Sequence, residues 1–394
     1  MTRRAAKRAG GAEAGRWRVA ILFGTRPEII KLAPVIRELE ERPRRFRSIQ
    51  IASGQHTDLL RPFARELGVR LDHDLQVGEE RQTPVQVCQR VLAALDPLLE
   101  RERPDALLVE GDTTTVLAGA LAAFYRKIPV GHVEAGLRSG DLSAPFPEEM
   151  NRRTVTGLAS FHFAPTEHNV RTLLDEGVSK DRIVQTGNPV VDSVQWALGH
   201  RKASARIDEL LTRVRGKKLV VLTTHRRESF GAIMEQHMRS LRRFVERHED
   251  TAVAFPVHPN PEVRERAERE LGGCARILLV EPLEYLDFVQ LLSKAWLIVS
   301  DSGGVQEEAP SVDRPLLVIR GNTERPEGIE AGLARLVGES PGALESLLEE
   351  CHADLGWFER SRPHSNPYGS GDSGRRIADA LEEFLARQDG PVPP

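Results

Sequence analysis

The sequence has few cysteines and no long hydrophobic run, and both shortages narrow the class of protein. Its three cysteines, Cys88, Cys274 and Cys351, lie far apart and form no CxxC pair. Such a set disfavours a disulfide framework and a zinc ribbon and indicates a reducing compartment, so we expect a cytoplasmic protein. The uncharged stretch Thr113–Tyr125 contains three threonines and a glycine and is shorter than the roughly 20 apolar residues of a membrane span. We therefore expect no membrane association.

An excess of charge of either sign is also missing. The 55 lysines and arginines nearly balance the 58 aspartates and glutamates, which leaves a formal net charge of -3. This balance gives no overall electrostatic reason to bind nucleic acid or an anionic membrane, so any anion site must be local. Residues 1–16 carry five basic residues but lack the apolar segment of a signal peptide. We expect them to form a disordered basic tail, with weak nucleic-acid contact as the alternative.

Two signatures of cofactor and metal binding are absent as well. The turn Gly24-Thr25-Arg26-Pro27 after the first expected strand lacks the GxGxxG pattern, which disfavours a nicotinamide cofactor. Five histidines fall on separate expected elements without ligand spacing such as HxxxH, namely His56, His132, His162, His225 and His258. We expect neither a cofactor nor a metal.

What the sequence does contain is a regular alternation of short apolar runs and longer amphipathic stretches. At 394 residues and 40% hydrophobic content, it can fill two cores. We expect strands at residues 18–23, 48–52, 106–109, 130–133, 161–164 and 182–185 and, in a second series, at 218–222, 252–256, 276–280, 297–299 and 316–319. The amphipathic stretches between them predict helices, right-handed crossovers and parallel sheets.

The pattern predicts an α/β protein of two doubly wound Rossmann-like domains that face a cleft. The first domain comprises residues 17–187 together with the last helix, within residues 375–394, and the second comprises residues 188–374. The hinge is placed at Gly187-Asn188-Pro189 because proline does not continue a strand. Ligands of such sheets bind at the carboxyl ends of strands, where the unusual residues of this sequence concentrate.

Two polar segments follow strands of the first half. In Gly24–Glu28, Arg26 precedes the expected helix, and with Lys31 it fits an anion site and a turn with solvated charges equally well. In Glu110–Thr115, Asp112 or a threonine suits the N-cap of the next helix, which is the commonest use of such residues. The same carboxylate and hydroxyls also suit a polar ligand.

A long loop in the first half carries two groups of carboxylates. The strand at 130–133 delivers Glu134 to its carboxyl end, and the loop then reaches Glu148, Glu149 and Arg152 at the start of a helix. An ion-paired loop followed by an acidic helix start is the structural alternative. General acid/base chemistry on two faces of a substrate requires such a pair of carboxylates.

The second half has polar strand ends of its own. A histidine beside two arginines follows the strand at 218–222, and this combination favours an anionic ligand. The segment Asp301–Glu308 places two glycines between a strand and a helix, which lets the backbone approach a diphosphate at the helix N-terminus. Glu308 suits a ribose diol, and Arg325 adds a cation after the next strand. A tight strand-to-helix turn is the alternative.

Together these segments resemble the non-hydrolysing UDP-N-acetylglucosamine 2-epimerases. The resemblance runs from about Val19 to Ala386, and its motifs in order are GTRPEIIK, GQH, EGDTTT, HVEAGLRSGDLSAPFPEEMNRR, THRRES, PVHPNP, SDSGGVQEEAP and ERPEG. It implies a glycosyltransferase B fold, a homodimer, no cofactor and the interconversion of UDP-GlcNAc and UDP-ManNAc, which supplies ManNAc units for cell-surface polysaccharide. It also implies elimination of UDP to a 2-acetamidoglucal, followed by re-addition.

The resemblance assigns roles by position. The catalytic residues would be Asp112, Glu134, Glu148 and His225. The residues that bind UDP and the sugar would be Arg26, Lys31, Arg152, Phe288, Ser302, Gly303, Gly304, Glu308 and Arg325. A second UDP-GlcNAc would bind as activator at Gln55, His56, Arg81 and Arg226. Asp58 departs from the glutamine that many relatives carry beside that activator site.

Other activities stay open at this point. A UDP-sugar glycosyltransferase of the same fold is one, although simple transfer gives the carboxylates of the HVEAGLR to PFPEE segment no role. A hydrolysing epimerase is another, but THRRES resembles the non-hydrolysing branch. A non-catalytic sensor would have lost a carboxylate, whereas Asp112, Glu134 and Glu148 are all present. No motif indicates which substituents the sugar of the substrate carries at C3 and C6. A UDP-diacetamido-uronic acid is therefore the alternative substrate.

Overall fold

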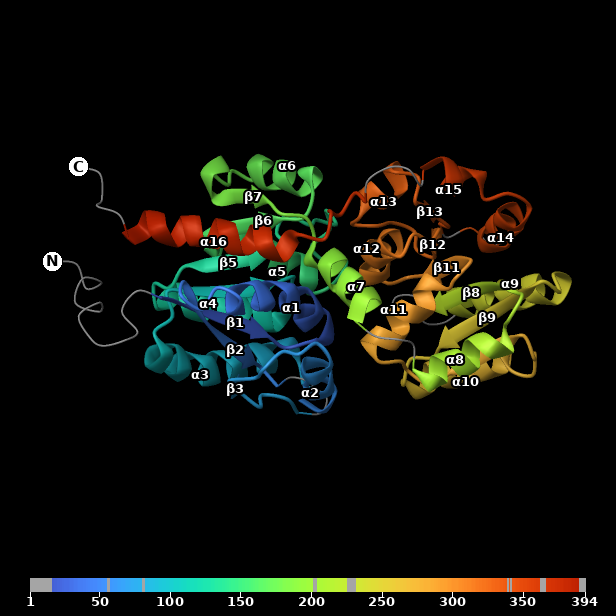
Figure 1. The fold of residues 1–394 in the computed structure, drawn as a ribbon, viewed down its shortest axis with the longest axis horizontal. Coiled ribbons are helices and arrows are strands. Elements are labelled where there is room, and N and C mark those ends of the chain that lie inside the picture. Colours follow the sequence, from blue (N-terminus) through green and yellow to red (C-terminus); the bar gives the residue numbers. More distant parts are fainter. Residues whose placement is uncertain are drawn as a thin grey trace. The chain divides into compact units, whose positions relative to one another are not determined.

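The computed structural model describes residues 16–54, 57–79, 82–200, 204–224, 232–338, 340, 342–361 and 366–389. This part of the chain divides into two compact units: the first runs to Ser193 and resumes at Gly369, and the second is Val194–Tyr368. Each unit is built on one parallel sheet with helices between the strands (Figure 1). Within the described residues, no helix is both long and apolar enough to cross a membrane.

The sheet of the first unit has seven strands in the order β3-β2-β1-β4-β5-β6-β7. They are β1 (Trp17–Phe23), β2 (Phe46–Ala52), β3 (His73–Asp74), β4 (Ala106–Glu110), β5 (Val130–Val133), β6 (Phe161–Ala164) and β7 (Ile183–Gln185). The strand order reverses between β1 and β4, so the carboxyl ends of these two strands form the switch point of the sheet. Doubly wound sheets bind their ligands at such a point.

Helices pack on both faces of this sheet, because β1 is apolar at every position from Val19 to Phe23 and all five residues are fully buried. On one face Leu22 shares a core with Val91 and Val116 of two helices. The last helix of the chain also belongs to this unit, and Phe384 stacks on Phe161 with ring centroids 4.4 Å apart. The helices are α1 (Arg26–Glu40), α2 (Thr57–Glu66), α3 (Pro84–Glu102), α4 (Thr114–Tyr125), α5 (Glu148–Leu158), α6 (Glu167–Asp175) and α16 (Ser373–Asp389).

The sheet of the second unit has six strands in the order β10-β9-β8-β11-β12-β13. They are β8 (Lys218–Thr223), β9 (Thr251–Pro256), β10 (Ile277–Val280), β11 (Leu297–Ser300), β12 (Leu316–Val318) and β13 (Ala334–Leu336). The switch point lies between β8 and β11, the same relation as β1 and β4 have in the first sheet. The second unit therefore repeats the doubly wound plan.

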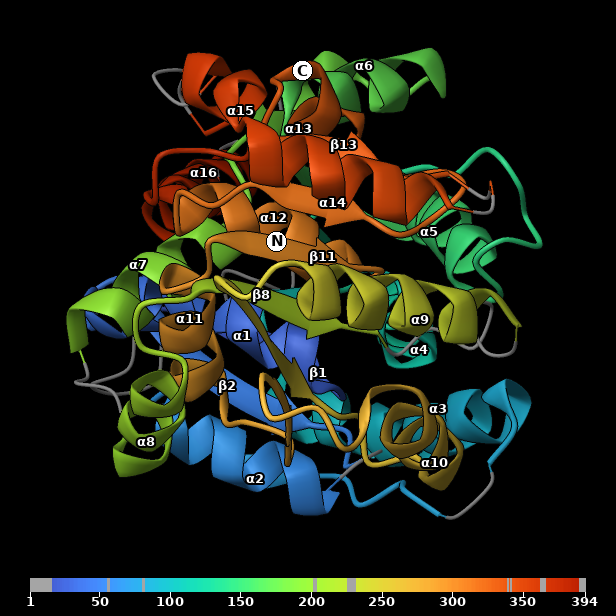
Figure 2. The same ribbon diagram turned by 90° about the vertical axis from the view of Figure 1, so that its right-hand side faces the viewer.

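The core of the second unit is apolar and continuous across one face of its sheet. Phe244 and Phe255 are fully buried there, with Leu348 and Phe358 from the C-terminal part of the unit. Figure 2 shows α9 and α14 side by side, where Arg243 donates a 3.0 Å hydrogen bond to Glu345. The helices are α8 (Ala205–Arg213), α9 (Ala232–Arg247), α10 (Pro261–Leu271), α11 (Tyr285–Ser293), α12 (Gly303–Ser311), α13 (Pro326–Glu330), α14 (Ala343–Ala353) and α15 (Gly356–Ser361).

All the expected strands are present within a few residues of their expected ends. The helix α7 (Pro189–His200) was not expected, and the boundary between the units falls after Ser193, inside it, rather than after Gly187. The first turn of α7 is tied to the first unit. Asp192 accepts hydrogen bonds from the N–H groups of Ser373 and Gly374 at 3.2 and 2.9 Å, and the Ser193 hydroxyl donates to the Ile30 carbonyl at 2.6 Å.

Candidate active site at the strand ends

The turn from β1 into α1 is organised by a buried carboxylate, Glu28. Its Oε2 accepts hydrogen bonds from the backbone N–H groups of Gly24 and Thr25, and Thr25 is the N-cap of the helix. Its Oε1 accepts a 2.5 Å hydrogen bond from the Thr113 hydroxyl, which follows β4. The Thr-x-x-Glu spacing of a capping box therefore also joins the ends of the two strands at the switch point.

Asp112 lies just past β4 and does not cap the helix that follows. Thr113 is the N-cap of α4, where its hydroxyl accepts a 3.3 Å hydrogen bond from the Val116 N–H. The Asp112 carboxylate instead accepts from Nε and Nη2 of Arg152, at 2.8 and 2.6 Å. The side chain of Arg152 is 6% exposed and that of Asp112 is 25% exposed, so this carboxylate is the solvent-facing end of the pair. The sequence offered Asp112 or a threonine as the N-cap of this helix, and in the structure the N-cap is Thr113.

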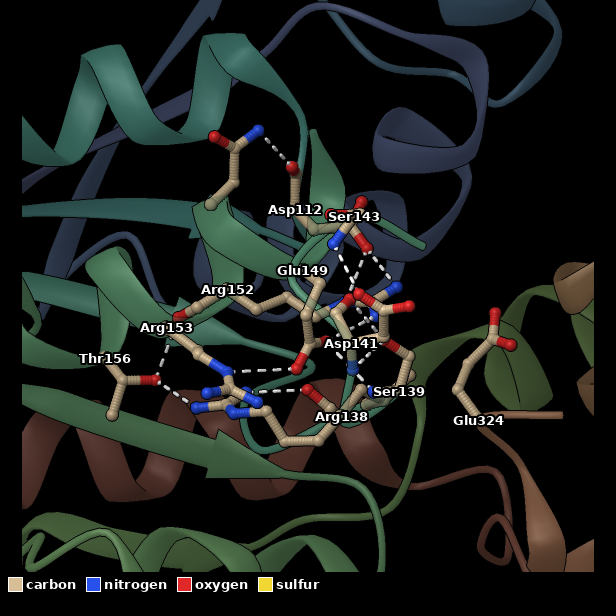
Figure 3. Close-up of polar contacts among 12 residues, drawn as sticks. Asp112, Arg138, Ser139, Asp141, Ser143, Glu149, Arg152, Arg153, Thr156 and Glu324 are labelled. Atoms are coloured by element: carbon tan, nitrogen blue, oxygen red, sulfur yellow. Dashed lines mark hydrogen bonds and ion pairs between the residues drawn. The ribbon is translucent and has the colours of Figure 1, made fainter. Parts of the chain in front are cut away.

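Glu149 fixes Arg152 from the other side (Figure 3). Its carboxylate accepts from Arg152 Nη1 at 3.2 Å and from Arg153 Nε at 3.1 Å. It also accepts a 2.9 Å hydrogen bond from the Ser139 N–H, which ties the loop after β5 to the start of α5. Burial opposes the charge, but these hydrogen bonds hold the pKa of Glu149 below its usual value. Glu149 thus orients Arg152 and, through it, Asp112.

A buried lysine joins the ends of β4 and β5. Lys31 on α1 forms ion pairs with Glu134 and, at 3.5 Å, with Glu110, and all three side chains are at most 8% exposed. Glu134 has a backbone φ of 63°, in the left-handed region that residues other than glycine rarely adopt. Such conformations persist where the surrounding structure imposes them, and they cluster at functional sites. Unlike the buried Lys31, Arg26 is exposed, and its guanidinium carbon lies 5.0 Å from the centre of the Phe63 ring.

Burial shifts the pKa values of several groups at this edge of the sheet. Burial raises the pKa of Glu28 to about 7, although the hydrogen bonds from Gly24, Thr113 and Thr25 oppose the shift. Burial also raises the pKa of Glu110; the Lys31 ammonium opposes this, whereas Glu134 adds to it. His132 on β5 is buried as well, and desolvation lowers its pKa to about 4. At neutral pH the His132 imidazole is therefore neutral. The raised pKa values of Glu28 and Glu110 favour the protonated form of these two carboxyl groups.

The strand ends of the second unit are held by hydroxyl groups. The Thr223 and Ser300 hydroxyls, at the ends of β8 and β11, lie 2.6 Å apart and are hydrogen bonded. The Thr224 hydroxyl donates to the Asp301 carboxylate at 2.8 Å. Ser302 is the N-cap of α12, and its side chain makes no capping hydrogen bond. The first turn of α12 thus begins directly after the switch point of this sheet.

The two glycines at the start of α12 have different surroundings. A Cβ on Gly303 would lie 2.6 Å from Nη1 of Arg325, so this glycine makes room for the guanidinium. A Cβ on Gly304 would meet only the Ser302 hydroxyl, at 3.9 Å, so this position faces open space. The space at Gly304 fits the expected role of admitting a diphosphate, whereas the missing side chain of Gly303 accommodates Arg325.

Arg325 is fixed in place beside Gly303. Its Nε donates to Glu307 at 2.6 Å and its Nη1 donates to Glu324 at 2.7 Å, and all three side chains are at most 9% exposed. Glu324 in turn accepts from Arg320 at 2.7 Å. A guanidinium held by two carboxylates is oriented before any ligand arrives. The sequence reading identified Arg325 but missed both carboxylates.

The remaining expected residues are placed as follows. Glu308 is buried in α12, Phe288 is half-buried on α11, and Glu148 is half-buried at the first position of α5. The sequence reading also gave no role to Glu28, Glu110 and Glu149, although the Thr25-x-x-Glu28 capping box is a recognisable signal for the first. Five expected residues lie outside the described part of the chain: His225, Gln55, His56, Arg81 and Arg226.

Comparison with known proteins identifies the family. The family described as UDP-N-acetylglucosamine 2-epimerase matches residues 37–382. The UDP-N-acetylglucosamine 2-epimerase of Escherichia coli K12 is 42% identical over 93% of this chain and 98% of its own. The Neisseria meningitidis UDP-GlcNAc 2-epimerase bound to UDP-GlcNAc superposes with a TM-score of 0.87 at 37% identity, over 93% of this chain and all of that one.

A second solved structure, the S. aureus MnaA-UDP complex, has the same TM-score of 0.87 at 37% identity, over 94% of this chain and 97% of that one. The resemblance found in the motifs is thereby confirmed over almost the whole length, and so is the fold of two Rossmann-like units. The chain is an isomerase and belongs to the UDP-N-acetylglucosamine 2-epimerase family.

Proposed function

We propose that this enzyme interconverts UDP-GlcNAc and UDP-ManNAc by elimination and re-addition of UDP. The C2 proton of the sugar is not acidic, so its removal must be coupled to loss of a leaving group. A base takes the C2 proton as the C1–O bond to UDP breaks, which leaves a C1=C2 double bond, the 2-acetamidoglucal. UDP then re-adds at C1, and an acid delivers a proton to the opposite face of C2.

The observation that carries this proposal is the pairing of Asp112 and Glu134 with buried cations at the ends of two adjacent strands. Arg152 holds Asp112, and Lys31 holds Glu134. Each carboxylate is thereby fixed in position, which general acid/base catalysis requires. Glu148, at the head of α5, is the third carboxylate that we assign to the proton transfers. Simple glycosyl transfer would not require these three carboxylates.

We assign the binding of UDP to the second unit. The N–H groups at the start of α12 and the open space at Gly304 suit a diphosphate, and Arg325 is oriented to receive one. These donors would stabilise the charge that develops on UDP as it leaves. His225, Ser302, Glu308 and Phe288 are assigned to the same nucleotide on the strength of the family motifs.

Incubation with UDP-GlcNAc in deuterated water, followed by NMR at C2, tests the reaction. We expect UDP-ManNAc to appear and deuterium to enter C2 of both epimers. The same preparation of Glu134→Gln, checked for folding by circular dichroism, controls for a contaminating host enzyme and should show neither change. An undeuterated, unepimerised C2 with the folded wild-type enzyme contradicts the proposal.

Two further activities are distinguished by product. Release of free sugar and UDP would indicate a hydrolysing epimerase, and transfer to an acceptor would indicate a glycosyltransferase. If UDP-GlcNAc is inert but a UDP-diacetamido-uronic acid is epimerised at C2, the reaction stands and the sugar changes.

We also propose a cytoplasmic homodimer that supplies ManNAc units for cell-surface polysaccharide, and activation by a second UDP-GlcNAc. Full-rate epimerisation of UDP-ManNAc without added UDP-GlcNAc contradicts that activation.

A further inference from the structure

Two histidines and two carboxylates meet on the surface of the second unit, away from the carboxyl ends of its strands. His248 follows α9 and Asp250 precedes β9, whereas Glu349 and His352 lie three residues apart on α14. The imidazole rings of His248 and His352 have centroids 4.0 Å apart. We refer to these four residues as the distal histidine cluster.

Each imidazole of the cluster is paired with one carboxylate. The His248 Nε2 lies 2.8 Å from Glu349 Oε2, and the His352 Nε2 lies 2.9 Å from Asp250 Oδ1. Donor atoms of His248, Asp250 and His352 all lie within 4.8 Å of one another. The two histidine side chains are 23% and 21% exposed, so the cluster is accessible from solvent and yet supported by its surroundings.

We propose that the distal histidine cluster binds one divalent transition-metal ion, with zinc as the ion of best fit. Zinc takes imidazole nitrogen and carboxylate oxygen at about 2.0–2.2 Å in a tetrahedron, whose ligand atoms are then about 3.4 Å apart. The separations among the donor atoms of His248, Asp250 and His352 bracket that value, and Glu349, beside His248, is the candidate for the fourth ligand. Two imidazoles with two carboxylates select zinc, nickel or copper over magnesium and calcium, which prefer oxygen alone.

The surroundings of the cluster favour ligation by preparing its groups. Asp250 is held from two sides, since its carboxylate oxygens lie 2.9 Å from His352 Nε2 and 3.3 Å from Lys218 Nζ. The His352 ring packs edge-on against Phe244 and Trp296, which limits its rotation. Preoriented ligands lose less freedom when the ion binds.

Two neighbouring cations compete with the metal. The Lys218 ammonium lies 3.3 Å from Asp250 Oδ2, and Arg247 Nη2 lies 2.9 Å from Glu349 Oε1. Lys218 is also 5.4 Å from the centre of the Trp296 ring, so it can leave Asp250 without losing its other contact. Removal of Lys218 should therefore strengthen metal binding, an effect that a merely structural ion-pair cluster would not produce.

A bound ion would join the end of α9, the turn before β9 and α14. Since α14 is distant in sequence from the other two segments, the ion would stabilise the folded second unit in proportion to its binding. The inference does not depend on the epimerase reaction. The expectation that no metal would bind rested on local histidine spacing, which cannot register residues brought together by the fold.

Calorimetric titration of the chelator-treated enzyme with zinc chloride at pH 7.5 tests the proposal. We expect one ion per chain with a dissociation constant of about 10 µM or tighter, and a rise in melting temperature. His248→Gln and His352→Gln should each weaken binding at least about tenfold. Lys218→Met should strengthen it several-fold. His168→Gln, which changes an exposed histidine of the first unit, should leave it unchanged.

Cobalt provides an independent readout that does not need enzyme activity. The intense visible absorption of tetrahedral cobalt should appear with the wild type and disappear with His352→Gln, while circular dichroism and UDP binding stay unchanged. The proposal is overturned if the wild type binds no zinc in this range, or if the two histidine variants and Lys218→Met bind it as the wild type does.

Discussion

The two units share one sheet plan but place opposite kinds of groups at the switch point. In the first unit, Glu28, Glu110, Asp112 and Glu134 crowd around the ends of β1, β4 and β5, and burial raises the pKa of Glu28 and Glu110. In the second unit the strand ends carry hydroxyls, an open glycine and an arginine clamped by two glutamates. The first arrangement suits proton transfer, whereas the second suits a fixed anion.

Under the proposed function, this difference lets one architecture support two tasks. A parallel sheet delivers short loops to one edge, and the charge placed in those loops decides whether the edge moves protons or binds phosphate. Both units contain buried cations that form ion pairs with carboxylates. The first unit uses Lys31 and Arg152 to orient acids, and the second uses Glu307 and Glu324 to orient Arg325.

The largest expected effect comes from neutralising an acid of the first unit. Glu134→Gln or Asp112→Asn should lower turnover about 10³-fold or more, because general acid/base groups contribute factors of this order. UDP affinity should change less than about threefold, since these residues act on the sugar. Steady-state kinetics and calorimetric UDP titration measure the two quantities. A parallel loss of UDP binding would assign these carboxylates to anchoring and remove the contrast between the units.

A smaller effect concerns the pH dependence of stability. The folded pKa of Glu28 is about 7, above its ordinary value of 4.5, so the folded state holds this proton more tightly than the unfolded state. The wild type therefore loses stability from this group as pH rises from 4.5 to about 7. The loss is about 1.4 kcal/mol per pH unit within that window.

Glu28→Gln removes this titration and keeps an acceptor for the backbone N–H groups. Relative to the wild type, the variant should gain about 2 kcal/mol between pH 5 and pH 6.5. Melting temperatures of both proteins across this range provide the measurement. Glu100→Gln alters an exposed glutamate of the same unit and should show no such trend. Parallel curves for Glu28→Gln and the wild type would refute a near-neutral Glu28.

The smallest effect separates the two glycines of the second unit. Gly304→Ala should lower UDP affinity about tenfold while melting at or slightly above the wild-type temperature, because alanine favours a helix by about 1 kcal/mol over glycine. Gly303→Ala should lower the melting temperature, because its Cβ would press on Arg325. Calorimetry and thermal unfolding compare them directly. Undiminished UDP affinity of Gly304→Ala would show that its open space does not receive the nucleotide.

Much of the fold was predictable because apolar runs and turn residues are local signals. The elements missed include the two-residue β3 and the three-residue β13, but also the regular helices α7, α8 and α14 and the short α15. For the site, motifs identified Asp112, Glu134 and Arg325, but their partners come from elsewhere in the chain. The pairing of Asp112 with Arg152 and of Lys31 with Glu134 depends on which strands become neighbours, and spacing along the sequence does not encode that.

The position of α16 has a consequence for how the chain is made. This helix comes last in the sequence, yet it packs on α1, and Phe384 covers Phe161 of β6 in the first unit. During synthesis the first unit emerges without its final helix, and it cannot be completed until the whole second unit has left the ribosome. The aromatic face of β6 stays open for that interval. The unit whose translation begins first therefore receives its final helix only at the end of synthesis.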